Sequence, residues 1–175
     1  MSQEAKVIAE GRHISMLNLN GWEYVDRPKP SGLVCITAVN DRDELILVEQ
    51  FRPPVRTTVI ELPAGLVGDV PGEENESLEL GARRELLEET GYEADSWKLV
   101  ASGPPSAGLA TEVLNLFVAT GLRRIGEGGG DASENISVHE VPLASLHEWL
   151  AQQSERGAMI DLKIFSGLYF LKQTL

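Results

Sequence analysis

Residues 83–92, RRELLEETGY, place three carboxylates, Glu85, Glu88 and Glu89, within five positions. On a helix, Glu85 and Glu89 lie one turn apart and point the same way, with Glu88 at the edge of that face. Carboxylates about 4 Å apart repel by about 4 kcal/mol at an effective dielectric constant near 20. A hard divalent cation removes this repulsion, and an all-oxygen, partly hydrated site suits Mg²⁺, with Mn²⁺ as an alternative. The spacing therefore predicts a metal site.

A solvated acidic helix face would also produce such a run of glutamates. Three features favour the metal site. Leu86 and Leu87 place apolar residues beside the acids, so we expect the helix to be closely packed. The turn at Ala64–Gly65 would bring backbone carbonyls near, and no pair of lysines lies between Glu85 and Glu89 to neutralise them.

The acidic helix resembles the Nudix box, whose pattern is G-x5-E-x7-R-E-U-x-E-E-x-G-U with U apolar. The match to this pattern holds at every fixed position from Glu76, through seven further residues, to residues 84–92. The opening glycine of the pattern would fall at Val70. Gly65 is the natural candidate for this opening glycine, and ten residues separate it from Glu76. We therefore interpret the loop at 67–75, VGDVPGEEN, as carrying a five-residue insertion. Loops tolerate such insertions at little cost in free energy.

The resemblance implies a role for each matching residue. Glu85 and Glu89 match the metal-binding acids, in agreement with the spacing argument. Glu88 matches a third acid that ligates the metal or orients the catalytic groups. Arg84 matches the arginine that holds the acids in place, and the carbonyl of Ala64 matches a backbone metal ligand. Members of the family are hydrolases that cleave a nucleoside diphosphate linked to another group.

Three further segments resemble the ADP-ribose pyrophosphatase branch of the family: WEYVDRP at 22–28, EQFRPPV at 49–55 and ELPAGL at 61–66. The resemblance then covers roughly residues 20–175. It implies metal-dependent hydrolysis of ADP-ribose to AMP and ribose 5-phosphate. The same reaction on GDP-mannose or ADP-glucose is an alternative. A Nudix-shaped module that binds nucleotides without hydrolysis is a third interpretation, which the complete set of box acids disfavours.

Candidate substrate contacts lie outside the box. Trp22 and Tyr24 alternate along an expected strand and would share a face. An aromatic ring stacked on adenine contributes about 1–3 kcal/mol, although ordinary strand packing explains both residues equally well. The guanidinium of Arg52 has the fixed donor geometry that binds a diphosphate. Arg27 is a second candidate for this contact, and a plain surface charge is its alternative.

The catalytic base is expected on a flexible loop. The resemblance implies a glutamate that follows a glycine-rich stretch and precedes an apolar strand, which places Glu134 there, in GGGDASENISV. We expect residues 126–133, GEGGGDAS, to form a mobile loop that closes over substrate. A glutamate in a disordered loop is the alternative interpretation. Glu112, at the junction of a loop and the strand at 112–122, is the second candidate for the base.

The elements that must position these residues are strands and a few helices, which indicates an α/β or α+β fold. The family resemblance implies an α/β/α sandwich with a mixed sheet. We expect strands at 33–39, 44–51, 57–66, 96–103, 112–122 and 136–143, and short N-terminal strands with a turn at Asn20–Gly21. Helices are expected from an N-cap at Asn75 to Gly91, at 143–157, and from Asp161 onward.

Composition and charge set the remaining expectations. The chain has 175 residues, a net charge of −12 and one cysteine, Cys35, within an apolar run. The acidic surface excludes general binding to nucleic acid. A buried structural cysteine and the absence of a signal or membrane-spanning segment predict a cytoplasmic protein. We divide the chain into an N-terminal β segment, 1–31, and a Nudix domain, 32–175. Family members form dimers through such segments, so we expect a homodimer in which Trp22 acts on the partner's site.

Overall fold

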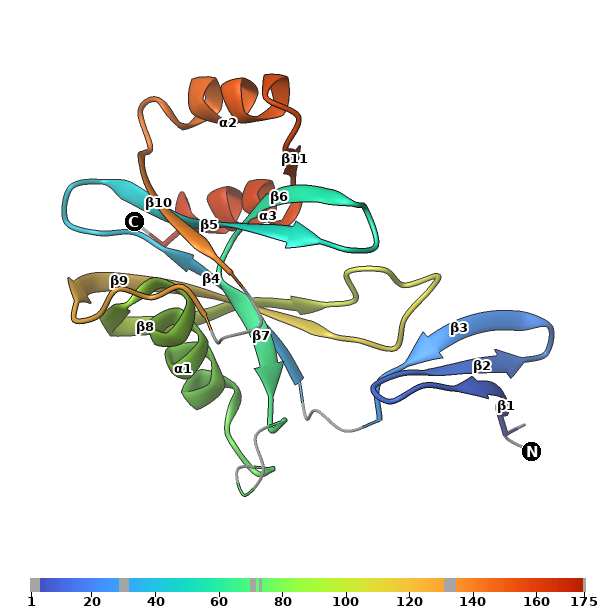
Figure 1. Ribbon diagram of the computed structural model, residues 1–175. Coiled ribbons are helices and arrows are strands. Elements are labelled where there is room, and N and C mark those ends of the chain that lie inside the picture. The colour runs from blue at the N-terminus through green and yellow to red at the C-terminus, as the bar shows by residue number, and fades with distance from the viewer. Residues whose placement is uncertain (1–3, 29–31, 70–71, 73, 131–134, 175) are drawn as a thin grey trace.

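The computed structural model describes residues 4–28, 32–69, 72, 74–130 and 135–174, and Figure 1 shows the arrangement of the elements. Within these residues the strands form one three-stranded sheet and two four-stranded sheets. The three helices are α1 (Leu78–Thr90), α2 (Leu146–Glu155) and α3 (Lys163–Leu171). None of these helices combines the length and the apolar character that crossing a bilayer would require.

The N-terminal sheet is an antiparallel meander of β1 (Lys6–Glu10), β2 (Ser15–Leu19) and β3 (Trp22–Asp26). It lies to one side of the rest of the protein (Figure 1). The turn between β2 and β3 falls at Asn20 and Gly21, as predicted, and both residues have positive φ angles, of 56° and 90°. Two central residues with positive φ give the turn a twist that matches paired strands.

The two larger sheets form the centre of the fold. One contains β7 (Ala64–Val67), β4 (Gly32–Ala38), β9 (Leu114–Arg124) and β8 (Tyr92–Gly103), in that order. It is a mixed sheet, because β4 and β9 are parallel and the other pairs are antiparallel. The other contains β10 (Ser137–Pro142), β5 (Glu44–Arg52), β6 (Thr57–Glu61) and β11 (Met159–Ile160).

Helices cover the central sheets from two sides. Val34, Ile36 and Ala38 on β4 belong to a buried cluster with Ala82 and Leu86 of α1. The intervening Cys35 belongs to a second cluster, with Leu150 of α2 and with Ile164 and Leu171 of α3. Alternate residues of one strand thus face opposite helices. The fold class, an α/β/α arrangement with a mixed sheet and a small N-terminal β segment, is confirmed.

Two predicted elements need correction. The strand expected at 57–66 is two strands in different sheets, because β6 ends at Glu61 and β7 begins at Ala64. Pro63 lacks a backbone N–H and favours such a break. Helix α1 is capped by Ser77 rather than Asn75, since the Ser77 hydroxyl accepts a hydrogen bond from the Leu80 N–H at 3.2 Å. Its C-cap is Gly91, as predicted, with a φ of 75°.

The first part of the loop expected to be mobile is bonded to the rest of the fold. The N–H groups of Gly129 and Gly130 donate to backbone carbonyls of α1 at 2.8 and 3.0 Å. The glycine content of the segment predicted a flexible loop. Glycine also lets two backbone segments approach closely, and the glycines here serve that purpose. Residues 131–133 of the same expected loop lie outside the described residues.

Cys35 is predicted to be chemically inert in the folded protein. Its side chain has no exposed area, and burial raises the pKa of its thiol to about 12. Because the thiolate is the reactive species, a disulfide reagent at pH 8 should modify almost no thiol in the native protein. After denaturation the same reagent should modify one thiol per chain. Equal rates in both states would contradict this burial.

Candidate active site

Two carboxylates of α1, those of Glu85 and Glu89, lie against β7. Glu85 and Glu89 are buried, with exposed fractions of 8% and 3%, whereas the side chain of Glu88 is 53% exposed. The Ala64 N–H donates to Oε2 of Glu89 at 3.1 Å. The structure therefore brings Glu85 and Glu89 to one buried face, as the helical spacing predicted, and leaves Glu88 at its edge.

Arg84 connects the carboxylates to the start of the helix. Its Nη1 donates to Glu85 at 2.8 Å and to Glu88 at 3.1 Å. Its Nε and Nη2 each donate to a different oxygen of Glu76 at 3.2 Å, and Nη2 also donates to the carbonyl of Leu66 at 2.8 Å. The planar fork of donors thus satisfies several acceptors from a single side chain.

The pairing of Glu76 with Arg84 limits the effect of the expected loop insertion. Glu76 also accepts the N–H of Gly68 at 3.4 Å. Its carboxylate is therefore held both by the helix and by the residue that follows β7. These contacts hold Glu76 beside Arg84 at the end of this loop.

Glu85 is in an environment that disfavours its negative charge. Burial raises its pKa to about 7, even though the Arg84 guanidinium lowers the pKa from 2.8 Å away. One arginine therefore does not compensate for the loss of water around this carboxylate. A further cation at Glu85 would restore the ionised form.

Gly65 makes room for Glu85. A Cβ atom added at Gly65 would lie 2.0 Å from the carboxyl carbon of Glu85 and 2.2 Å from its nearer oxygen. No side chain fits that space, so the backbone of β7 and the carboxylate touch directly. This close approach gives a physical reason for a glycine at position 65 of ELPAGL.

The acids of α1 form a donor set that suits a divalent cation. Glu85, Glu88 and Glu89 supply carboxylate oxygens only, which is the chemistry that Mg²⁺ and Mn²⁺ prefer. In the part of the chain that the structure describes, no three acidic, histidine or cysteine side chains are already grouped as a metal site. Arg84 holds two of the acids in this arrangement, and the exposed Glu88 side chain has room to reorient. The residues fit a hard cation once Glu88 reorients.

Three of the predicted substrate-binding residues, Trp22, Tyr24 and Arg27, lie on β3 of the N-terminal sheet or directly after it. Trp22 is 64% exposed, and its indole N–H donates to the carbonyl of Gly108 at 3.0 Å. Tyr24, two residues along the same strand, is partly buried. Arg27 is not an isolated surface charge, because its Nε lies 2.9 Å from a carboxylate oxygen of Glu112.

The remaining predicted residues are more widely spread. Arg52, at the end of β5, donates to Glu61 on β6 at 2.6 Å, so it is engaged within the sheet. Glu61 is buried, and sequence reasoning gave it no role. Its acidic side chain within the strand TTVIE was the signal that could have revealed it. Glu134, the first candidate for the base, lies outside the described residues.

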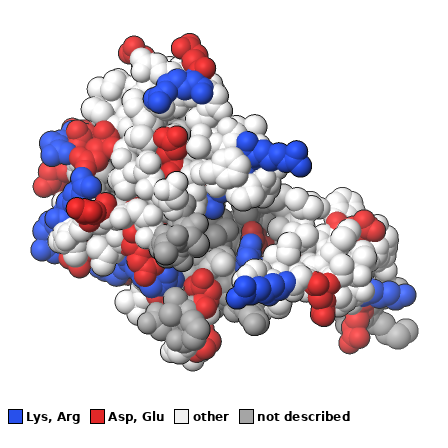
Figure 2. All heavy atoms as spheres, viewed as in Figure 1, with Lys and Arg blue, Asp and Glu red and all other residues white. Residues whose placement is uncertain are grey.

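A pocket of about 560 Å³ lies beside the start of α1. Its walls include the Arg27–Glu112 pair and Glu76, together with Asn115 of β9 and Leu66 of β7. In Figure 2 the surface is hollowed where the N-terminal sheet meets the main body, with charged side chains inside the hollow. The pocket therefore offers acidic and basic groups to a ligand close to the carboxylate helix.

Asn115 is a pocket residue that the sequence analysis missed. It is buried, its amide donates to the Leu33 carbonyl at 3.2 Å, and its oxygen accepts the Ser102 hydroxyl at 2.7 Å. A buried amide within the apolar strand LNLFVA was the available signal, because a buried polar group requires partners. Asn115 ties the start of β4 to β8 at the floor of the pocket.

Comparisons with known proteins point to one family. The model of the NUDIX domain matches residues 28–161. The chain is 38% identical over 138 residues to the ADP-ribose pyrophosphatase of Mycobacterium tuberculosis, covering 78% of this chain and 63% of that protein. It is 38% identical over 116 residues to the ADP-ribose pyrophosphatase of Bacillus subtilis, covering 66% and 60%.

One further curated relative and one solved structure also match the chain. The chain is 32% identical over 123 residues to the methanol dehydrogenase activator of Bacillus methanolicus, covering 70% of this chain and 64% of that protein. The matches thus span about three fifths of the length of these curated relatives. A crystal structure of an ADP compounds hydrolase has the same fold, with a TM-score of 0.73, 22% identity, and coverage of 98% of this chain and 91% of the other.

Gly65→Ala is predicted to destabilise the protein, because the new methyl group would collide with the Glu85 carboxylate. Overpacking of this kind costs about 1–3 kcal/mol in the free energy of unfolding, which denaturant titration measures. Gly103→Ala is the matched control, since a Cβ there meets nothing within 4 Å. Equal stability of the two variants would show that Glu85 can move away freely.

Proposed function

Because the chain belongs to the NUDIX domain family, as its sequence predicted, we propose that it is a metal-dependent hydrolase of nucleoside diphosphate sugars. The preferred reaction is hydrolysis of the diphosphate of ADP-ribose to AMP and ribose 5-phosphate. The observation that carries this proposal is the burial of Glu85 and Glu89 on one face of α1, against Ala64 and Gly65. Two buried carboxylates there suit a cation and the anionic diphosphate that it attracts.

Glu85, Glu88 and Glu89 would hold Mg²⁺, with Mn²⁺ as a substitute, and the carbonyl of Ala64 is the proposed backbone ligand. When bound, the ion neutralises charge on the diphosphate and lowers the pKa of a water molecule. Arg84 fixes the acids through its hydrogen bonds to Glu85 and Glu88. A fixed carboxylate arrangement reduces the reorganisation needed when substrate binds.

The nucleotide would bind beside the 560 Å³ pocket. Trp22, exposed and held by the Gly108 carbonyl, is the proposed platform for the base of a nucleotide in the partner's site, with Tyr24 next to it. Arg27 and Arg52 are the proposed phosphate contacts, and each would exchange its present carboxylate partner for a phosphate oxygen.

For the proton of the attacking water, Glu134 is the proposed acceptor and Glu112 the second candidate. A general base must lie within hydrogen-bond reach of the proton that it accepts, directly or through one water. Replacing either glutamate with glutamine would distinguish the two.

The choice of ADP-ribose follows relatives such as the ADP-ribose pyrophosphatases of Mycobacterium tuberculosis and Bacillus subtilis. The GDP-mannose pyrophosphatase of Cronobacter sakazakii, 32% identical over 138 residues, supports GDP-mannose as the alternative substrate. A stacking platform accepts any purine, so the sugar and the base must be decided by assay. A purely binding role is disfavoured, because all the acids of the box are present.

A homodimer is also part of the proposal, with residues 1–31 as the dimerising segment and 32–175 as the catalytic domain. The N-terminal sheet exposes apolar side chains, among them Val7, Ile8, Leu19 and Trp22. A second copy of the chain would cover these side chains and bring Trp22 to the partner's site. Exposed apolar patches of this kind commonly mark interaction surfaces.

The proposed function predicts metal-dependent turnover with a preference for ADP-ribose. A panel of ADP-ribose, ADP-glucose and GDP-mannose is incubated with Mg²⁺, Mn²⁺ or EDTA, and phosphate is measured after coupling to a phosphatase. Glu89→Gln should lower kcat by orders of magnitude, because it removes a buried charge from the proposed metal site. Glu79→Gln, on the exposed side of α1, is the control. Full turnover in EDTA would overturn the proposal.

Replacing Trp22 tests the platform separately from the chemistry. Loss of a stacked base costs about 1–3 kcal/mol, so Trp22→Ala should raise KM for ADP-ribose by about 5- to 150-fold with little change in kcat. Tyr169→Ala, which removes an exposed aromatic ring from α3, serves as the control. An unchanged KM in steady-state kinetics would make Trp22 a packing residue.

A further inference from the structure

The C-terminal end of α1 is closed by a segment that lies far along the chain. We call residues 126–130, GEGGG, the glycine segment. The N–H of Gly130 donates to the Glu88 carbonyl at 3.0 Å, and that of Gly129 donates to the Glu89 carbonyl at 2.8 Å. The Gly126 N–H donates to the Gly91 carbonyl at 3.1 Å. Helix-end carbonyls lack partners within the helix, and here the glycine segment supplies them.

These hydrogen bonds fall where the electrostatics of α1 are least favourable. The C-terminal end of a helix carries a partial negative charge, and basic side chains near it are stabilising. The last turn of α1 contains Glu88 and Glu89 and no basic residue. Two backbone N–H dipoles from the glycine segment point at the carbonyls of these same residues and partly offset the charge.

The close contact depends on a missing side chain at Gly128. A Cβ atom there would lie 2.4 Å from the carbonyl carbon of Thr90 and 2.7 Å from the carbonyl oxygen of Glu89. Both neighbours are backbone atoms of α1, so they cannot rotate away as a side chain could. A substitution at Gly128 must push the segment away from the helix end.

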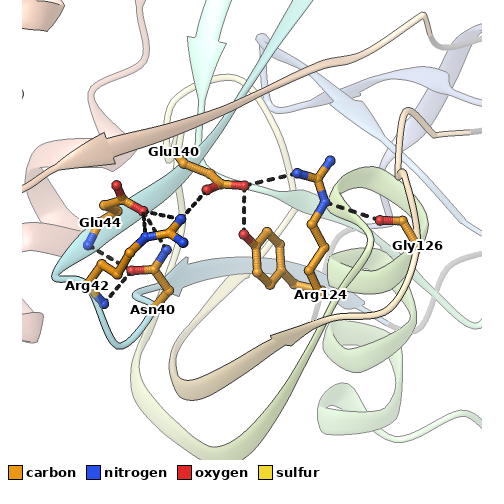
Figure 3. A network of polar contacts seen from close by, with 7 residues as sticks. Asn40, Arg42, Glu44, Arg124, Gly126 and Glu140 are labelled. Carbon is orange, nitrogen blue, oxygen red and sulfur yellow. Dashed lines mark hydrogen bonds and ion pairs between the residues drawn. The ribbon is translucent and has the colours of Figure 1, made fainter.

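A network of charged side chains holds the start of the glycine segment (Figure 3). Arg124 donates to the carbonyls of Gly126 at 3.2 Å and Glu127 at 3.4 Å, and to the Glu140 carboxylate at 3.1 Å. Glu140 also accepts the Tyr92 hydroxyl at 2.7 Å. Tyr92 begins β8 directly after the helix cap, so both ends of the contact are tied to Glu140.

We propose that the glycine segment is a positioning element for the metal-binding carboxylates. It holds the last turn of α1 in helical geometry through the carbonyls of Glu88 and Glu89, and it thereby fixes where these two side chains begin. This inference rests on the proposed function of α1 as a metal site. It adds Gly128 and Arg124 as positioning residues, neither of which touches the metal or the substrate.

The test compares Gly128→Ala with Gly157→Ala. Both glycines have positive φ, of 72° and 93°, but a Cβ at Gly157, after α2, meets nothing within 4 Å. The readouts are the Mn²⁺ dissociation constant, from the electron paramagnetic resonance signal of free Mn²⁺, and hydrogen exchange of the last turn of α1. Gly128→Ala should weaken Mn²⁺ binding by about ten- to a hundredfold, as loss of outer-shell support does at metal sites, and should speed exchange there. Gly157→Ala should lower thermal stability alone.

Arg124→Gln provides an independent variant, because it weakens the anchor and leaves every glycine in place. It should weaken Mn²⁺ binding in the same direction, so the inference stays testable if Gly128→Ala does not fold. Unchanged Mn²⁺ affinity in Arg124→Gln and in folded Gly128→Ala would overturn the positioning role and leave the proposed function intact. Failure of the unmodified protein to bind Mn²⁺ would instead overturn the proposed function.

Discussion

The burial of two carboxylates on one face of α1 is the constraint on which the rest of the structure depends. Glu85 and Glu89 lie almost entirely out of water, and buried charges are unfavourable unless other groups satisfy them. Arg84 pairs with Glu85, and the Ala64 N–H donates to Glu89. Even so, burial raises the pKa of Glu85 to about 7, so the folded protein holds a carboxylate short of positive charge. A cation bound at Glu85, as proposed, would offset this cost.

Glycines make this arrangement sterically feasible at both ends of the helix face. Gly65 lets the β7 backbone touch the Glu85 carboxylate, and Gly128 lets a distant segment touch the backbone at Glu89. Each contact replaces a side chain with backbone atoms. The Glu85 carboxylate thus contacts the β7 backbone as well as Arg84, and the backbone of the last turn of α1 contacts the segment at Gly128.

The shared face of the α1 carboxylates and the end of α1 could be predicted from the sequence, because the signals for both are local. Helical spacing placed Glu85 and Glu89 on one face, and the glycine at 91 marked the end of the helix. The N-cap was misplaced because Asn75 and Ser77 are both good capping residues, and only the hydrogen bond to Leu80 decides between them. The break at Pro63 separates two sheets, a tertiary fact that strand propensity does not contain.

What the sequence could not supply are contacts between segments far apart in the chain. The bond from Arg27 to Glu112 and the packing of Gly128 on Thr90 each join distant residues. The spacing of residues along one helix or strand carries no information about them. The same holds for Glu61, whose partner Arg52 lies on the neighbouring strand. The helix α1 and the face that carries its buried acids were therefore predicted, whereas the pocket became visible only in three dimensions.

The attachment of the N-terminal sheet links two parts of the candidate site. Val25 on β3 donates its N–H to Leu109 at 2.7 Å and accepts the N–H of Thr111 at 3.1 Å, so β3 and the segment before β9 form one hydrogen-bonded unit. That segment continues directly into Glu112, which pairs with Arg27 just beyond β3. A displacement of the N-terminal sheet therefore carries Glu112 and one wall of the pocket with it. A second copy that pairs with this sheet would act on the shape of the pocket as well as on its own contacts.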